Sequence, residues 1–452
     1  MNKKTLLAFI VGAFIANGSQ AQEHAFSLKE CLEAALKNNQ NIAISRYEEQ
    51  IGEHKITETR SRALPQVNGT GNFTDNFKKQ VIVLPGEFVG QPGKTIAQEM
   101  GTTYNTAVAL EANQAIFDMA AFTGIKASKA ARDYYKVNTA RTEDEVINSV
   151  SQLYYQILAF NEQIKVIDTN IARLNNLVVI TEGQYKNGLA RKIDLDRIKV
   201  NLTNAQTQKL ESDNRLQSLY NNLKVQMAYN IDEPLELSDL PLQAVEEKAT
   251  GYILNSEFNL ANRNEIRLLD AQRDLYALQV KAIKAEYYPR LSAFFSYNYN
   301  GISNDFGDLW KKNGSDIWYG VGAFGARLNI PIFDGFARRS RVAQARISLL
   351  ENEKQREYTA LQLTAGFRNS QAQMLNNISA IKAQRDNVKL ASEVYASSQE
   401  NYKLGLATLT DLLDAQSSFV DARNSYTQAL FNYKIAELES IRSTGNLRSL
   451  LQ

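Results

Sequence analysis

Several kinds of residue and segment are scarce in this chain, and each scarcity excludes a class of protein. The 452 residues include one cysteine, Cys31, so an intrachain disulfide framework is impossible. The only two histidines, His24 and His54, lack Cys, Asp or Glu partners at the spacing of metal ligands. After the first 21 residues no run of 18 apolar residues occurs, which argues against a transmembrane helix. We therefore expect no disulfide scaffold, no metal and no cofactor.

Excess charge is missing as well. The chain has 51 Lys and Arg against 49 Asp and Glu, and removal of Lys3 and Lys4 with a leader would leave 49 of each sign (51 − 2 = 49). A net charge of zero argues against nucleic acid as the partner. Proline is also rare. None of the seven lies between 116 and 232 or after 331, so nothing in these long stretches forces a helix to break.

Residues 1–21 have the pattern of a secretory signal peptide. Lys3 and Lys4 precede an apolar run from Leu6 to Ala16, and Ser19-Gln20-Ala21 forms a small-x-small cleavage site. A membrane-anchor helix is the alternative, but the apolar run is too short to span a bilayer. We predict an exported protein that is not lipid-anchored, because Cys31 lacks the preceding small residues of a lipoprotein site. The spacing around Cys31 in SLKECLEAALKNN instead predicts a buried thiol.

One motif occurs twice in the chain. QYKNGLARKIDLDRI (184–198) and NYKLGLATLTDLLDAQ (401–416) align at an offset of 217 residues (402 − 185). This offset is 31 × 7, so both copies keep the same heptad phase. Similar offsets relate NNQNIAI (38–44) to NRNEIRL (262–268) and NQAIFD (113–118) to NIPIFD (329–334). The chain therefore consists of two structural repeats.

Two very long helices follow from a sustained heptad pattern. The apolar or aromatic positions recur every seventh residue at Val150, Ile157, Ile164, Ile171, Val178 and Tyr185, and at Phe367, Met374, Ile381, Val388, Tyr395 and Tyr402. A period of seven is typical of helices that wrap around neighbours as in coiled coils. The first of them, about 68 residues, would be about 100 Å long at 1.5 Å per residue. We expect an elongated, rod- or tube-like protein.

Four segments alternate with the period of two that is typical of strands. Two of them follow Pro65 and Pro289, and the other two end just before the long helices. Each contains about ten alternating residues, with aromatic residues toward one end. Trp310, Trp318 and Tyr319 occupy the positions of an interfacial aromatic girdle. An ordinary sandwich hairpin with one solvated face is the alternative. The signal peptide and the long helices favour strands that span the outer membrane.

These patterns predict the organisation of the whole chain. The predicted segments are a signal peptide at 1–21, a first repeat at 22–231, an equatorial connector at 232–254, a second repeat at 255–447 and a tail at 448–452. The first repeat contains a helix at 27–63, strands at 65–78 and 102–117, a long helix at 119–187 and a helix at 191–230. The second contains a helix at 255–288, strands at 289–301 and 318–333, a long helix at 335–404 and a helix at 408–445. The predicted fold class is mainly α, with four transmembrane β-strands per chain.

Four strands cannot close a barrel, and open sheet edges are not tolerated in lipid. Two copies would supply eight strands, whose interior is filled by side chains. Three copies would supply twelve, the smallest multiple of four that leaves a lumen. The predicted inward faces carry Asn, Ser, Thr and Gly, which suits water. We therefore predict a homotrimer whose strands form one barrel and whose helices form a tube.

The signal peptide, the two repeats, the IFD segments before the long helices and GLATLTDLLDAQ (405–416) together resemble the TolC-like outer-membrane efflux family. The resemblance covers essentially the whole mature chain. It implies a trimeric channel with a twelve-stranded barrel in the outer membrane and an α-helical tunnel in the periplasm. It also implies a periplasmic adaptor and an inner-membrane pump or secretion ATPase as partners, with export of drugs, metals, peptides or proteins.

The resemblance implies roles for several residues. Asp411 and Asp414 match the acids that line the constriction at the periplasmic end, although Thr408 and Asp411 also fit a helix capping box. Tyr402 and Asp194 match the two residues whose bond latches the closed state in the family. Alternatively, Tyr402 only continues the heptad pattern of its helix and Asp194 only caps a helix. Where typical members have the Arg of a second latch, this chain has Ala407, and Arg191 or Lys192 could substitute.

The two helix–helix turns are predicted to face the adaptor. Each contains a glycine that permits a tight reversal and a leucine that the reversal does not require. The pairs are Gly188 with Leu189, and Gly405 with Leu406.

Two other interpretations are weaker. GVGAFG (320–325) matches the dinucleotide-binding GxGxxG, but it lies inside a strand pattern with no helix after it, so small residues on a strand explain it better. No Ser/His/Asp or Cys/His set suggests an enzyme. A soluble periplasmic coiled-coil adaptor or spacer without a pore is the alternative function, but an adaptor needs one helical hairpin rather than two with four alternating strands.

Overall fold

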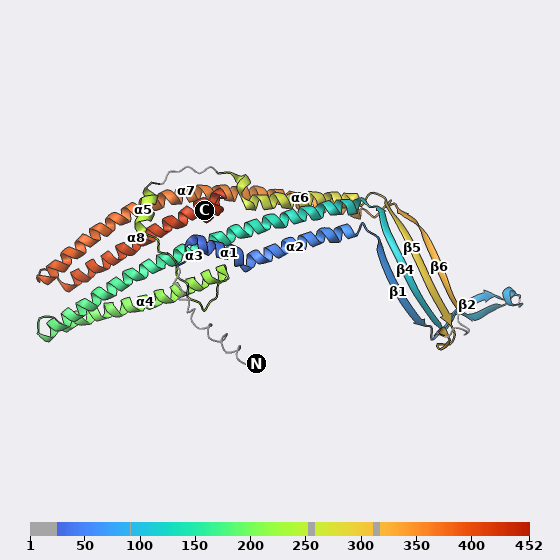
Figure 1. The fold of residues 1–452 in the computed structure, drawn as a ribbon, viewed down its shortest axis with the longest axis horizontal. Helices are drawn as coiled ribbons and strands as arrows, with labels where there is room; N and C mark the ends of the chain where they lie inside the picture. Colours follow the sequence, from blue (N-terminus) through green and yellow to red (C-terminus); the bar gives the residue numbers. More distant parts are fainter. Residues whose placement is uncertain (1–24, 91, 252–257, 311–316) are drawn as a thin grey trace, which may run out of the picture. The chain divides into compact units, whose positions relative to one another are not determined.

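The computed structural model describes residues 25–90, 92–251, 258–310 and 317–452, so the predicted signal peptide lies outside the described residues. The chain divides into two compact units (Figure 1). The helical unit comprises the described residues up to Arg46 together with 137–267 and 357–452. The strand unit comprises 47–136 and 268–356. Each unit draws on both sequence repeats.

Helices make up most of the described residues. They are α1 (Leu28–Asn38), α2 (Gln40–Ser61), α3 (Met119–Lys186), α4 (Lys192–Met227), α5 (Leu242–Thr250), α6 (Asn264–Ala285), α7 (Ala337–Lys403) and α8 (Leu409–Thr444). The helices α3 and α7 have 68 and 67 residues, and no proline interrupts either of them. Short 3₁₀ turns lie at Gly86–Val89, Leu260–Asn262, Asp308–Trp310 and Leu447–Leu451.

The helix predicted at 27–63 is two helices, because Asn39 interrupts it. The backbone of Asn39 leaves the helical region, with φ −58° and ψ 132°. Its side-chain Oδ1 accepts a hydrogen bond from the backbone N–H of Asn41 at 2.9 Å, which caps the start of α2. Its Nδ2 donates to the carbonyl of Gln226 at 2.7 Å. One asparagine thus ends α1, begins α2 and fixes both against α4.

The connector of the two repeats is held against the start of the described chain and contains a short helix. Phe26 pairs in parallel with Leu237, and α5 lies within the predicted connector. The next helix, predicted from 255, begins at Asn264. The structure does not describe 255–257; a 3₁₀ turn at Leu260–Asn262 follows, and Arg263 is extended, with φ −83° and ψ 122°.

Three apolar clusters stabilise the helical unit. The largest is built on α1, α3, α4 and α8 and includes Cys31, Leu32, Ile147, Ile157 and Leu223. A second joins α5 to α7 and α8, with Met374, Ile381 and Tyr433 fully enclosed. The third, here called the turn-proximal cluster, consists of Leu174, Ile198, Ala205, Leu409 and Leu413. It contains residues of both helical hairpins, α3–α4 and α7–α8.

The strand unit contains one antiparallel sheet of four strands in the order β1-β4-β5-β6. The strands are β1 (Gln66–Asp75), β4 (Tyr104–Phe117), β5 (Arg290–Ser303) and β6 (Ile317–Asn329). Figure 1 shows them side by side. The central pairing, from Tyr104 opposite Ser303 to Phe117 opposite Leu291, joins the two repeats. β6 ends at Asn329 rather than at 333, because Pro331 cannot donate a ladder hydrogen bond.

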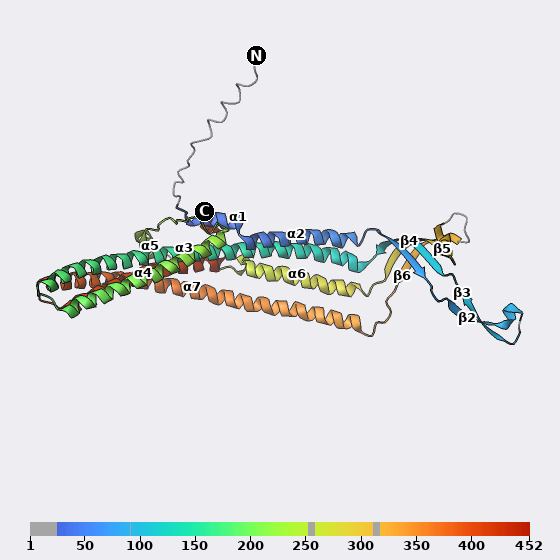
Figure 2. The same cartoon turned by 90° about the horizontal axis from the view of Figure 1, so that it is seen from below.

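A separate β-hairpin, which the sequence-based prediction missed, connects β1 to β4 along the chain. The segment 79–101, between the predicted strands 65–78 and 102–117, contains the antiparallel strands β2 (Gln80–Pro85) and β3 (Thr95–Met100). Figures 1 and 2 show this hairpin projecting beyond the end of the four-stranded sheet. At the tip of the hairpin, Gly90 and Gly93 have positive φ of 76° and 81°.

Within the described parts of the chain, no helix combines the length and apolarity needed to cross a membrane.

Candidate functional site

The two helical hairpins turn in the same way at the same end of the helical unit (Figures 1 and 2). Gly188 follows α3 with φ 76°, and Gly405 follows α7 with φ 74°. The next residue in each turn, Leu189 or Leu406, donates its N–H back to the helix at 2.8 Å. A Cβ on either glycine would meet nothing within 4 Å, so positive φ alone requires glycine here.

The leucines of both turns point away from the protein. Leu189 is 81% exposed and Leu406 is 76% exposed. Each turn closes through backbone hydrogen bonds and a glycine, so neither leucine is needed for the reversal. Two apolar side chains that contribute nothing to the turn are therefore presented to solvent at one end of the unit.

Asp411 closes a capping box at the start of α8. Its Oδ2 accepts hydrogen bonds from the backbone N–H of Thr408 at 2.9 Å and from the Thr408 hydroxyl at 2.7 Å. The Thr408 hydroxyl in turn accepts from the Asp411 N–H. The side-chain hydrogen bond from Thr408, followed by the backbone one, lowers the pKa of the Asp411 carboxyl. The predicted capping box is confirmed.

Asp414 has no part in that cap. It lies one helical turn further along α8 and is exposed, and its backbone carbonyl accepts a hydrogen bond from Ser418. Two carboxylates thus lie three residues apart on one face at the start of α8. The pore constriction predicted for Asp411 and Asp414 concerns several copies of the chain and stays a prediction.

The predicted latch residues have other partners within this chain. Asp194 forms an ion pair with Arg191, with Nε–Oδ2 at 2.9 Å and Nη2–Oδ1 at 3.2 Å. Tyr402 packs on the turn-proximal cluster. No hydrogen bond between Tyr402 and Asp194 is found among the described residues. Arg191, which could have substituted for the Arg of the second latch, is thus the partner of Asp194, the carboxylate of the first latch.

Polar contacts between the hairpins lie elsewhere, and the sequence did not reveal them. Arg197 on α4 donates to the hydroxyl of Thr410 on α8. Gln416 on α8 donates to Asn170 Oδ1 on α3 at 2.7 Å. A signal for the second contact was available, because Gln416 is a polar residue in an otherwise apolar stripe of α8. It is only 4% exposed, and a buried amide needs a partner.

An arginine also bridges the hairpins. The Arg173 guanidinium on α3 lies 5.2 Å from the ring centroid of Tyr395 on α7 and 5.1 Å from that of Phe419 on α8. The two rings are stacked on each other, 5.8 Å apart and 4° from parallel. Such contacts are cation–π interactions.

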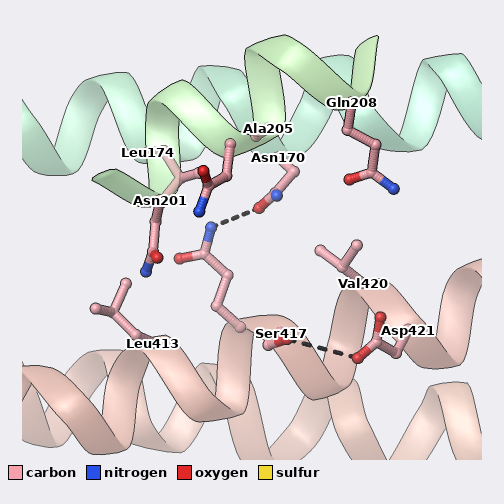
Figure 3. Close-up of a pocket in the computed structure, with 11 residues that line it drawn as sticks. Asn170, Leu174, Asn201, Ala205, Gln208, Leu413, Ser417, Val420 and Asp421 are labelled. Atoms are coloured by element: carbon pink, nitrogen blue, oxygen red, sulfur yellow. Dashed lines mark hydrogen bonds between the residues drawn. The ribbon is translucent and has the colours of Figure 1, made fainter. Parts of the chain in front are cut away.

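A cavity of about 230 Å³ lies between the hairpins beside the Asn170–Gln416 bond (Figure 3). Figure 3 shows Asn201 and Gln208 of α4 on one side, with Ser417 and Asp421 of α8 on the other. Amide, hydroxyl and carboxylate groups dominate its lining, and water-sized molecules fit it. The hairpins are therefore joined by specific contacts beside a polar cavity.

Several aromatic residues of the strand unit lie near one end of β5 and β6. The Trp318 ring stacks on Tyr299 at 5.0 Å and lies 6.3 Å from Trp310. Trp310 is 69% exposed and Tyr319 is 44% exposed. Their predicted place at a membrane interface stays a prediction.

The GVGAFG segment (320–325) lies inside β6, and the nucleotide-binding interpretation is wrong because no helix follows it. Its glycines give room to aromatic rings of β5. A Cβ on Gly320 would lie 2.5 Å from the Tyr297 hydroxyl oxygen, and one on Gly325 would lie 3.1 Å from Phe294. Among the described residues no group of three or more His, Cys, Asp and Glu could hold a metal ion.

Comparison with known proteins agrees with this architecture. The sequence pattern of the family described as outer membrane efflux protein matches residues 31–227 and 257–446. The chain belongs to the outer membrane efflux protein family. The matched segments contain both hairpins and all four strands of the sheet, so the family match includes every residue of the candidate site.

Several named relatives of this efflux protein family are similar along their length. The outer membrane protein TolC of Salmonella enteritidis is 22% identical over 452 residues, which cover 99% of this chain and 87% of the relative. The proteases secretion protein PrtF of Dickeya chrysanthemi is 20% identical over 99% of this chain and 93% of its own. The predicted resemblance to a TolC-like outer-membrane factor is confirmed.

Solved structures of outer membrane proteins share the fold. The Campylobacter jejuni CmeC outer membrane channel has a TM-score of 0.73 and 16% identity, covering 93% of this chain and 85% of that one. The outer membrane protein VceC of Vibrio cholerae has a TM-score of 0.70 and 15% identity, covering 92% and 96%. The mainly helical fold with a small set of strands is thus the fold of known outer membrane channels.

Proposed function

We propose that three copies of this chain form a channel-tunnel in the outer membrane, through which substrates leave a tripartite efflux or type I secretion assembly. The open sheet of the strand unit is the observation that carries the proposal. Its outer strands β1 and β6 each have one edge that pairs with nothing among the described residues. Three such sheets joined edge to edge would give twelve strands and remove every edge.

Strand length supports a membrane location for this sheet. β4 and β5 each have 14 residues and β6 has 13, while β1 has 10. About 9–11 tilted residues suffice to span a bilayer. Phe73, Phe324 and Leu328 are exposed by 52%, 87% and 59%, as lipid-facing side chains would be in a single chain. A soluble adaptor or spacer would leave this apolar surface and both sheet edges in water.

The relatives indicate what class of partner and cargo fits. PrtF of Dickeya chrysanthemi is named a proteases secretion protein, and TtgC of Pseudomonas putida a toluene efflux pump outer membrane protein. By analogy, this chain works with a periplasmic adaptor and an inner-membrane pump or secretion ATPase. The exposed leucines Leu189 and Leu406 would dock the adaptor. Residues 1–21 would direct export and then be cleaved, and the mature chain would enter the outer membrane without a lipid anchor.

The turn end of the helical unit would be the closed end of the tunnel. In a trimer, Asp411 and Asp414 from three copies would place six carboxylates around one aperture, which would favour cations over anions. Tyr402 and Asp194 would form a latch that competes with the Arg191–Asp194 ion pair. Because that ion pair is already present, Tyr402→Phe should raise the resting conductance only modestly.

Fractionation and conductance test the proposal. The protein should remain with outer membranes, require detergent for extraction, and run as one species of three chains. In planar bilayers it should form cation-selective channels that are mostly closed. A stable monomer that keeps its sheet, or recovery in the soluble periplasm, would contradict the trimeric channel. Replacing both Asp411 and Asp414 by Asn should reduce the cation selectivity, while Asp421→Asn, on the cavity, should not.

A further inference from the structure

One side chain of the first hairpin contacts both helices of the second. Arg173 on α3 belongs to the first hairpin, whereas Tyr395 on α7 and Phe419 on α8 belong to the second. Its guanidinium carbon lies at nearly equal distances, 5.2 and 5.1 Å, from the two ring centroids. Arg173 therefore contacts the pair of rings and, through it, both helices of the second hairpin.

The Asn170–Gln416 hydrogen bond lies on the same two helix faces. Asn170 is three residues before Arg173 on α3, and Gln416 is three residues before Phe419 on α8, so each pair shares a face. We call the five residues Asn170, Arg173, Tyr395, Gln416 and Phe419 the hairpin clamp. The Asn170–Gln416 hydrogen bond borders the polar cavity, which is large enough to admit water (Figure 3). The arginine contact is the part of the clamp that water replaces less easily.

The chemistry of Arg173 suits a reversible contact between hairpins. No carboxylate forms an ion pair with it in the part of the chain that the structure describes, and Phe419 is only 8% exposed. The guanidinium is planar and permanently charged, so it stacks on aromatic faces, whereas a lysine ammonium is a compact point charge. The turn-proximal cluster beside it contributes apolar burial, which is not directional. The clamp adds directional contacts that the cluster lacks, as do the Arg197–Thr410 and Gln163–Gln428 hydrogen bonds between the same hairpins.

We propose that Arg173 is the positioning residue that holds the second hairpin against the first in the resting channel, and that opening withdraws its guanidinium from Tyr395 and Phe419. This inference rests on the proposed channel function. It assigns the resting contact to Arg173, Tyr395 and Phe419, which lie further from the turns than the predicted latch residues Tyr402 and Asp194. It places the control of opening on α3, which carries no residue of the predicted latch.

Conductance of reconstituted trimers tests the clamp. Arg173→Gln should raise the ratio of open to closed channel by about tenfold, since it removes cation–π contacts with two partly desolvated rings. Phe419→Leu should raise it by a similar factor, and the double variant should open no more than either single one. Phe419→Tyr keeps the ring and should behave like the parent. Arg173→Lys should open more than the parent in spite of its charge.

A matched control exists within one hairpin. Arg215 on α4 lies 5.4 Å from the ring centroid of Phe160 on α3, so this contact is of the same kind but does not join the two hairpins. Arg215→Gln should therefore leave the resting conductance unchanged. Equal trimer yields on native gels would show that the variants assemble normally.

The outcomes separate the clamp from the channel. If the parent forms trimers that never conduct, the proposed function fails, and the clamp fails with it. If the parent conducts but Arg173→Gln and Phe419→Leu stay as closed as the parent, the clamp alone is wrong. Should these variants not assemble, Cys residues at 173 and 419 in a Cys31→Ala chain can be joined by a short bifunctional thiol reagent. The cross-link should hold the channel closed, and free opening of cross-linked trimers would overturn the clamp.

Discussion

At the scale of single residues, the start of α8 shows how one side chain can have two roles. The Asp411 carboxylate caps its own helix through Oδ2, while its second oxygen takes no part in the capping box. The cap is a property of one chain, and the ring of carboxylates would be a property of three. Neither role excludes the other, because the cap fixes the carboxylate at a defined point on the helix end.

The cap leads to a prediction for acid. Hydrogen bonds from Thr408 lower the pKa of Asp411 below its ordinary value of 3.8. A carboxyl with a lowered folded pKa contributes stability above its unfolded pKa and loses it as the pH falls through the folded one. The stability difference between the parent and Asp411→Ala should therefore be constant from about pH 5 to about pH 8 and shrink at pH values below 3.8. Urea unfolding of solubilised protein at several pH values measures it, and an undiminished difference at acid pH would contradict the cap.

Cys31 gives the second prediction at this scale. The thiol is completely buried, and burial, followed by the nearby Glu30 carboxylate, raises its pKa to about 12. The buried thiol expected from the helical spacing is thus confirmed. The native protein should not react with a maleimide at neutral pH, whereas the unfolded chain should take up one equivalent. Mass spectrometry of both samples gives the answer, and rapid native labelling would refute it.

At the scale of elements, the sequence predicts those features that depend on residues close together in the chain. The absence of proline permits the long α3 and α7, and Pro65 and Pro289 immediately precede β1 and β5. The break at Asn39 was missed, because no Pro or Gly marks it and its carboxamide acts through Gln226, 187 residues away. β2 and β3 were missed because the segment 79–101 contains Pro and Gly residues, which are typical of loops.

In the candidate site, too, contacts between near neighbours in the sequence were predictable and contacts between distant residues were not. The glycine turns and the capping box depend on neighbours within a few residues, and both were visible in the sequence. The contacts of Arg173 with Tyr395 and Phe419 join residues more than 200 positions apart. Heptad phase shows that Tyr395 faces a neighbouring helix, but the choice of Arg173 as its partner depends on how the hairpins pack.

The prediction at the scale of elements compares a glycine in a turn with a glycine inside a helix. Gly405 has φ 74° in the turn, whereas Gly366 lies inside α7, where a Cβ would meet nothing within 4 Å. Gly405→Ala should destabilise the protein by about 1–2 kcal/mol, the cost of a left-handed conformation. Gly366→Ala should stabilise it by about 0.5–1 kcal/mol, because glycine is a poor helix former. Denaturant midpoints of both variants test this, and equal shifts would contradict the assigned backbone conformations.

At the scale of the whole molecule, the two repeats contribute to both units. β4 of the first repeat pairs with β5 of the second, and the turn-proximal cluster contains residues of both hairpins. The chain therefore presents two similar turns at one end of the helical unit. Three copies would present six of them, each with an exposed leucine, and a repeating partner surface could engage all six.

The last prediction concerns this end of the assembly. Leu189→Asp combined with Leu406→Asp should abolish cross-linking to the adaptor while trimers stay intact, because the leucines are exposed and the turns close without them. Asn187→Asp adds the same charge to the first turn but keeps both leucines, so it should retain most of the cross-linking. Cross-linking in intact cells, with trimer yield measured in parallel, distinguishes these results. If the double variant still cross-links fully, the adaptor binds elsewhere on the helices, and Leu189 and Leu406 are not exposed in order to bind it. If Asn187→Asp loses cross-linking as completely, charge rather than the leucine side chains determines docking.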